Sequence, residues 1–132
     1  MSIDELQAKL NAGASAVSLA EEALLKIEST KNLNAYISVL SDYALEKAKE
    51  SDKRRAEGKS LGALDGIPVA IKDNMCLTGT RTTAASKILE NFVAPYTATA
   101  VEKLEAAGAV IVGKTNMDEF AMGSSNETSY FG

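Results

Sequence analysis

Two short apolar runs place the strongest constraint on the fold of this 132-residue chain. The first covers residues 67–73 (Ile-Pro-Val-Ala-Ile-Lys-Asp) and follows a glycine; the second covers residues 109–113. Short apolar runs bounded by Gly or Pro are typical of buried strands. Between them we predict a helix over residues 98–107, capped by Thr97 and closed by Gly108. This order predicts a βαβ unit, with parallel strands joined by a right-handed crossover.

The first half of the chain is predicted to be mainly helical. Ser2 and Ser18 each stand three residues before a glutamate, which is the spacing of a capping box. The spacing predicts a short helix that ends near Gly13 and a second helix over residues 19–30. A short strand is expected over residues 33–40.

A third helix is expected to start at Ser41 or Asp42, one of which would cap it, and to reach about Arg55. A turn-rich segment over residues 58–66 ends the helical half. A short helix is also expected at residues 117–122.

The fold class is therefore α/β. N-terminal helices, over about residues 1–60, precede part of a mixed, largely parallel sheet with crossover helices, over about residues 61–132. So small a sheet would have exposed edges, which natural proteins rarely leave uncovered. The polar stretch 123–132 is typical of a loop that leads onward. We therefore interpret residues 1–132 as the N-terminal portion of a single larger domain.

Charge argues against nucleic-acid binding by this segment. The net charge is −4 and the pI is about 4.9, whereas a phosphate-binding surface needs clustered basic residues. The one basic cluster, Lys53-Arg54-Arg55, is interpreted as a solvated helix face because acidic residues flank it.

Composition also bears on location. A single cysteine, Cys76, excludes an internal disulfide and is interpreted as a packed small residue. The N-terminus lacks the features of a signal peptide, and no apolar stretch approaches the roughly 20 residues of a membrane helix. These features predict a cytoplasmic protein without a membrane partner.

The chain contains no histidine, which removes several mechanisms. A Ser-His-Asp triad and a Cys-His dyad are excluded within it. No metal site is expected, since only carboxylates and one thiol could serve as ligands. Lys72, at the end of the first apolar run, becomes the leading candidate. With its stem in the core its amine would be partly desolvated, which would lower its pKa and make it a base able to activate a serine.

Structural roles for these polar residues stay open beside the chemical ones. Lys72 could instead reach solvent or pair with a carboxylate such as Asp73. The neighbouring Asp118 and Glu119 are interpreted as a charge preference at a helix N-terminus, because adjacent helical residues do not face each other. Ser124 and Ser125 are interpreted as loop hydroxyls that bond backbone groups.

The chain resembles a known family over nearly its whole length, and two stretches carry the resemblance. Residues 62–74 (Gly-Ala-Leu-Asp-Gly-Ile-Pro-Val-Ala-Ile-Lys-Asp-Asn) resemble the catalytic-lysine strand of the amidase signature family. Residues 108–125, which contain Thr-Asn-Met-Asp-Glu-Phe-Ala-Met-Gly-Ser-Ser, resemble the branch of that family that works in tRNA-dependent amidotransferases. The resemblance implies an incomplete amidase signature fold.

The resemblance also implies a mechanism. The family uses a nucleophilic serine, a bridging serine and a lysine, and Lys72 matches the lysine. The two glycine-rich stretches that carry the serines are not among these 132 residues, so we expect the chain alone to be inactive. The segment Met122, Gly123 and Ser124 matches an earlier loop of the family, which lies near the substrate pocket.

The implied activity is hydrolysis of glutamine to supply ammonia for converting Glu-tRNA(Gln) to Gln-tRNA(Gln). The implied partners are the B and C subunits of the complex, with tRNA bound only through the complex. ATP and Mg²⁺ would be used by the assembled complex, and no cofactor is expected in this chain. The alternatives are a stand-alone amidase for small or peptide amides, and a non-catalytic interaction or structural module.

Overall fold

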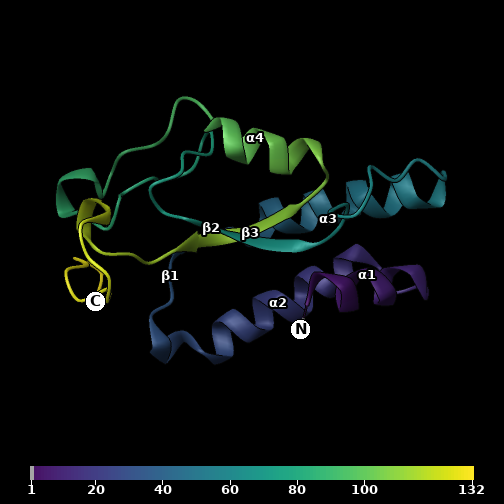
Figure 1. The fold of residues 1–132 in the computed structure, drawn as a ribbon, viewed down its shortest axis with the longest axis horizontal. Helices are drawn as coiled ribbons and strands as arrows, with labels where there is room; N and C mark the ends of the chain where they lie inside the picture. The colour runs from purple at the N-terminus through teal and green to yellow at the C-terminus, as the bar shows by residue number, and fades with distance from the viewer. Residues whose placement is uncertain (1) are drawn as a thin grey trace.

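A computed structural model describes residues 2–132, and Figure 1 shows a small sheet with helices on both of its faces. The elements in chain order are α1 (Ile3–Asn11), α2 (Ala16–Ser29), the 3-10 turn η1 (Lys31–Leu33), β1 (Tyr36–Val39), α3 (Ser41–Ala56), β2 (Pro68–Lys72), η2 (Lys87–Leu89), α4 (Thr99–Ala106), β3 (Val110–Thr115) and η3 (Glu119–Ala121).

The sheet has the strand order β1-β3-β2. Strands β2 and β3 are parallel, from the pair Pro68 and Val110 to the pair Lys72 and Thr115, and α4 connects them. This confirms the predicted βαβ unit. Strand β1 adds to the other side of β3 in the antiparallel sense, which makes the sheet mixed and confirms the α/β class.

The core has one layer on each face of the sheet. Helices α1, α2 and α3 bury apolar side chains such as Leu10 and Leu19 against Val110. Helix α4 covers the opposite face (Figure 1), where Val101 packs with Ile111. Full burial of a side chain such as Val101 contributes about 1.5–3 kcal/mol, so both layers hold β2 and β3 in place.

The first two helices differ in how well local sequence predicted their starts. The capping box of α1 is confirmed: Ser2 Oγ accepts from the Glu5 backbone N–H (3.2 Å), and Glu5 Oε2 accepts from that of Ser2 (2.7 Å). The predicted start of α2 is wrong, because the helix begins at Ala16 with Ser15 as its cap.

A distant carboxylate explains the earlier start of α2. Asp52 on α3 accepts hydrogen bonds from the backbone N–H groups of Ala16 (2.6 Å) and Val17 (3.2 Å). These are donors that a helix cannot satisfy internally. A side chain more than thirty residues away therefore supplies part of the cap.

Three other local predictions are wrong. The residue before α3 is Leu40, and neither Ser41 nor Asp42 caps that helix. Thr97 does not cap α4; its Oγ1 accepts from the Thr78 backbone N–H (3.0 Å) instead. The helix expected at residues 117–122 is only the short η3, because the φ of Phe120 is +53°.

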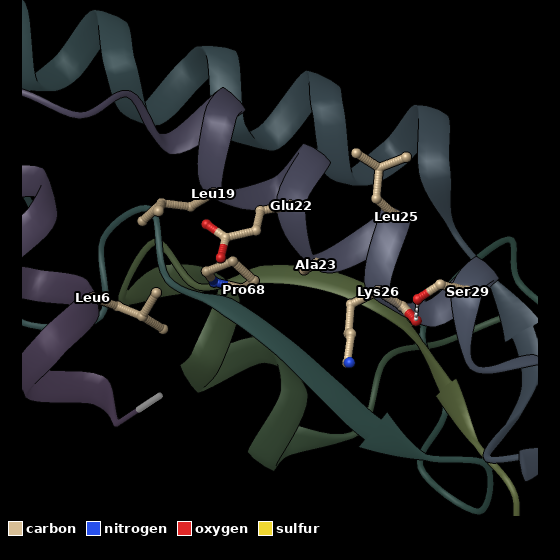
Figure 2. Close-up of a pocket in the computed structure, with 8 residues that line it drawn as sticks. All are labelled: Leu6, Leu19, Glu22, Ala23, Leu25, Lys26, Ser29 and Pro68. Carbon is tan, nitrogen blue, oxygen red and sulfur yellow. Dashed lines mark hydrogen bonds between the residues drawn. The ribbon is translucent and has the colours of Figure 1, made fainter.

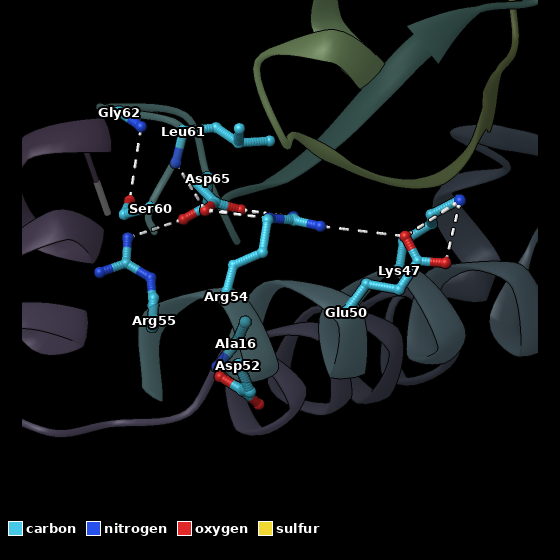
Figure 3. A network of polar contacts seen from close by, with 10 residues as sticks. All are labelled: Ala16, Lys47, Glu50, Asp52, Arg54, Arg55, Ser60, Leu61, Gly62 and Asp65. Carbon is cyan, nitrogen blue, oxygen red and sulfur yellow. Dashed lines mark hydrogen bonds and ion pairs between the residues drawn. The ribbon is translucent and has the colours of Figure 1, made fainter. Parts of the chain in front are cut away.

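The basic cluster on α3 is not simply a solvated face, which corrects the sequence interpretation (Figure 3). Arg54 Nη2 donates to Oδ1 of Asp65 at 2.7 Å, and the Asp65 side chain is fully buried. Arg55 donates to the Asp65 carbonyl at 2.8 Å. The two arginines therefore fasten the loop before β2 to α3, whereas Lys53 is exposed.

Candidate active site

Lys72 is the last residue of β2 and lies beside Thr115 of β3. Its side chain is exposed, and among residues 2–132 its amine has no hydrogen-bond or ion-pair partner. The expectation of a stem in the core and a partly desolvated amine is therefore wrong for the described residues. Lys72 is the last residue of β2, and its side chain lines a pocket instead of packing in the core.

That pocket has a volume of about 470 Å³. Besides Lys72, its lining residues come from the end of β3 and from the chain that follows it: Thr115, Asn116, Met117, Asp118, Ala121, Gly123, Ser124, Ser125 and Asn126. The structure thus brings Lys72 together with Gly123 and Ser124, two of the three residues assigned to a substrate-pocket loop. The third, Met122, does not line the pocket, and its side chain is 73% exposed.

A second lysine near the site was missed by the sequence analysis. Lys114 on β3 is fully buried, and its Nζ lies 3.2 Å from Asp73 Oδ1. It donates to the Arg81 carbonyl (3.1 Å) and to Thr82 Oγ1 (3.0 Å). Asp73, the carboxylate suggested as a partner for Lys72, is therefore occupied by Lys114.

Asp73 also anchors the loop that follows β2. Its Oδ2 accepts from the backbone N–H (2.9 Å) and the hydroxyl (2.5 Å) of Thr83. Its own backbone N–H donates to the Thr115 carbonyl at 3.2 Å. The residue next to Lys72 is thus held by side chain and backbone at once, which leaves the end of β2 little freedom.

Two pairs of neighbouring residues have a left-handed backbone, one pair in the loop after β2 and the other beside the pocket. Ala84 and Ala85 have φ values of +47° and +56°, and Phe120 and Ala121 have +53° and +60°. Such conformations cost roughly 1–3 kcal/mol each for non-glycine residues, and they often lie at functional sites. The two pairs are joined, because the Phe120 N–H donates to the Ala84 carbonyl at 2.9 Å.

One carboxylate holds the loop that forms a wall of the pocket. Oδ2 of Asp118 accepts from the backbone N–H groups of Ser125 (3.1 Å) and Asn126 (2.9 Å). Oδ1 accepts from the N–H (3.4 Å) and the hydroxyl (3.0 Å) of Thr128. Bonds from Asn126 and Thr128 lower the pKa of Asp118 below its ordinary value. The interpretation of Asp118 as a helix-start charge is therefore incomplete, and nothing local in the sequence indicates this anchor.

A larger hollow lies elsewhere on the described residues. It has about 810 Å³ and is lined mainly by apolar side chains of α1 and α2, with Pro68 at the opposite end of β2 from Lys72 (Figure 2). The only charged side chains in its lining are Glu22 and Lys26. It places no candidate residue for amide chemistry, so the smaller polar pocket is the better candidate site.

Two other kinds of feature, a metal-binding cluster and a membrane-spanning helix, are absent from the described residues. Within residues 2–132, no group of three or more His, Cys, Asp or Glu side chains could hold a metal ion. No helix in that range has the length and apolar character needed to cross a bilayer. Cys76 is buried and unpaired, as expected of a packed residue.

Comparison with known proteins identifies the family. The model of the family described as Amidase matches residues 18–132. The chain belongs to the amidase family. Over 133 residues this amidase chain is 52% identical to the A subunit of the mitochondrial glutamyl-tRNA(Gln) amidotransferase of Xenopus laevis, covering 100% of the chain and 25% of that relative.

Solved amidase structures show the same fold. The A subunit of glutamyl-tRNA(Gln) amidotransferase from Thermotoga maritima superposes with a TM-score of 0.73 at 38% identity, over 99% of this chain and 26% of that one. The peptide amidase of Stenotrophomonas maltophilia gives a TM-score of 0.85 at 36% identity, over 91% and 25%. The amidase chain therefore spans about a quarter of the length of these relatives.

Proposed function

We propose that this chain is the N-terminal part of the glutamine-hydrolysing subunit of an amidotransferase that converts Glu-tRNA(Gln) to Gln-tRNA(Gln). One observation carries the proposal. Lys72 and the loop residues Gly123 and Ser124 line one polar pocket. They do so in a chain that is 52% identical over its whole length to a subunit of that name.

Lys72 is the proposed base of the reaction. In its neutral form the Lys72 amine would take the proton of a bridging serine, which would in turn take the proton of the nucleophilic serine. The nucleophile oxygen would bond to the amide carbon of glutamine, the C–N bond would break, and ammonia would leave with the transferred proton. Water would then release glutamate. Both serines would come from parts of the protein outside these 132 residues, so the chain alone would not turn over.

The partners and cofactors belong to the same proposal. The B and C subunits would receive the ammonia and present the tRNA, in the cytoplasm, with ATP and Mg²⁺ used by the assembled complex. Among residues 2–132 no group of three or more His, Cys, Asp or Glu side chains gathers that could hold a metal ion. No step of the proposal therefore passes through a metal in this chain.

The direct experiment is a Lys72→Ala change in the whole protein, assayed for ammonia release from glutamine. A general base contributes about 10²–10⁴ in rate, so a loss of at least that size is expected. Lys103→Ala, an exposed lysine on α4, is the matched control and should keep full activity. Ammonia release that persists in Lys72→Ala would show that Lys72 is not the base.

A stand-alone amidase is the second candidate, favoured by the TM-score of 0.85 with a peptide amidase. Co-purification of the whole protein separates the two. The amidotransferase proposal expects B and C subunits to elute with it, whereas a stand-alone amidase would elute alone and hydrolyse peptide amides. Incubation of the 132-residue chain with glutamine tests its expected inactivity: turnover that Lys72→Ala blocks would contradict it.

A further inference from the structure

The loop that lines the pocket together with Lys72 has little regular structure of its own. From Gly123 to Thr128 the chain forms neither helix nor strand, and all of these residues are exposed. Such loops hold a defined shape only when their backbone groups find partners. Here four bonds to the loop come from one side chain, Asp118, which is only 7% exposed.

The carboxylate of Asp118 is fully used by the loop. A carboxylate offers about four lone-pair sites. Oδ2 fills two with the N–H groups of Ser125 and Asn126, and Oδ1 fills two with the N–H and hydroxyl of Thr128. No acceptor site is left for a substrate, although Asp118 borders the pocket. The side chain therefore acts on the loop.

Gly123 makes the anchor compact. A Cβ at this position would lie 2.3 Å from Asp118 Cγ and 2.6 Å from Oδ1, closer than real Cβ atoms approach. The loop can pass over the carboxylate only because residue 123 has no side chain. Thr128 closes the other side, since its hydroxyl also accepts from the Glu119 backbone N–H at 3.0 Å.

We propose that Asp118 is a positioning residue that holds the loop over residues 123–128 as a substrate-binding wall of the pocket that Lys72 also lines. This inference rests on the proposed function for its kinetic consequence, but not for its structural one. Asp118 sets where the loop groups meet the amide substrate, and Lys72 supplies the base. Loss of the anchor should therefore weaken substrate binding more than it slows the chemical step.

The experiment uses the whole protein with Asp118→Asn. The amide NH₂ replaces one acceptor by a donor that faces the loop N–H groups, so two of the four bonds are lost. The KM for glutamine should rise on the order of tenfold, with kcat changed less than about twofold. Amide hydrogen exchange of residues 123–128 should become faster. Glu46→Gln, an exposed acid on α3, is the control and should change neither.

A milder variant covers the case in which Asp118→Asn does not fold. Thr128→Val removes only the hydroxyl bonds at an exposed position. Its KM should rise about two- to fivefold, and exchange should increase over the same residues.

A pair of variants tests the packing of the anchor. Gly123→Ala should raise KM strongly alone, because its methyl group displaces the Asp118 carboxylate. In an Asp118→Ala background the same methyl group should add less than a twofold change. An equal rise in both backgrounds would overturn the proposed contact.

Enzyme kinetics and amide hydrogen exchange together distinguish a failure of the Asp118 inference from a failure of the proposed function. Asp118→Asn with unchanged KM and exchange, or with a loss confined to kcat, would overturn the inference and leave the proposed function intact. If the unmodified whole protein releases no ammonia from glutamine, the proposed function fails. Exchange over residues 123–128 still decides the role of Asp118 in that case.

Discussion

Lys72 and Lys114 occupy the ends of neighbouring strands, yet their surroundings are opposite. In the register of β2 and β3, Ile71 lies beside Lys114 and Lys72 lies beside Thr115. A shift of one position along a strand turns a side chain to the other face of the sheet. Lys114 is therefore enclosed beneath the loop at Arg81, whereas the Lys72 amine reaches the pocket.

The difference in burial suits Lys114 to a structural role and leaves Lys72 available for the proposed chemical role. A buried lysine that must pair with a buried aspartate is costly to disturb. Lys72 is exposed and has no partner among the described residues, so replacing it removes no contact of the core. The locked pair of Lys114 and Asp73 adjoins Lys72 and so holds the strand end from which the free amine projects.

The largest effect is expected from Lys114→Met. It leaves the buried Asp73 charge unpaired, which typically costs about 3–5 kcal/mol in the free energy of unfolding. Denaturant unfolding of the whole protein measures it, with the exposed Lys103→Met expected to change it by less than about 0.5 kcal/mol. Replacing Asp73 by Asn in the Lys114→Met background removes the unpaired charge but keeps an acceptor for Thr83, so part of the loss should be recovered. A Lys114→Met cost below about 1 kcal/mol would contradict the comparison.

A second ion pair tests whether partial exposure softens the effect. Asp65 is fully buried, but its partner Arg54 keeps 26% of its side chain exposed. Asp65→Asn should lower the free energy of unfolding at pH 7 by about 1.5–3 kcal/mol, whereas Glu46→Gln on the same helix as Arg54 should not.

The same pair predicts an acid dependence. Burial acts to raise the pKa of Asp65, but hydrogen bonds from the Arg54 guanidinium and the Leu61 backbone N–H lower it below its ordinary value of 3.8 on balance. Because the folded-state pKa is lowered, the contribution is fully present above pH 3.8 and is lost as the pH falls through the folded value. The stability difference between the unmodified protein and Asp65→Asn should therefore shrink below pH 3.8. A constant difference from pH 7 to pH 3 would argue against this.

A smaller effect, of opposite sign, is expected beside the pocket. Ala121 has a φ of +60°, which glycine adopts without strain. Ala121→Gly should therefore raise the free energy of unfolding by about 0.5–1 kcal/mol. Ala8→Gly, at an exposed position within α1, should lower it by about 0.8–1 kcal/mol. Destabilisation by both changes would show that the backbone at Ala121 is not strained.

The smallest effect on stability is expected at Lys72 itself. Its side chain is exposed and unpaired among the described residues, so Lys72→Met should change the free energy of unfolding by less than about 0.5 kcal/mol. The same variant should have lost its amidase activity under the proposed function. A destabilisation comparable to that of Lys114→Met would remove the distinction between the two lysines.

The sequence predicted the elements better than their ends. The two apolar strands, the crossover helix and the Ser2 cap were predicted correctly, because short runs and caps depend on neighbouring residues. The start of α2 was not, because Asp52 reaches it from α3. For the site, Lys72 was predicted from its place at the end of an apolar run and from a family resemblance, whereas the loop residues Gly123 and Ser124 came from the resemblance alone. Their roles stay predictions, as does the assignment of residues 1–132 to one domain.

By itself, the sequence determined the α/β class, the parallel strand pair and the family, because hydrophobic periodicity and contiguous motifs are local properties of the chain. Only the tertiary structure decided which lysine is buried, and that Asp118 is committed to a loop. Those outcomes depend on strand register and on partners such as Asp73 and Lys114, which are distant in sequence and meet only when the sheet forms.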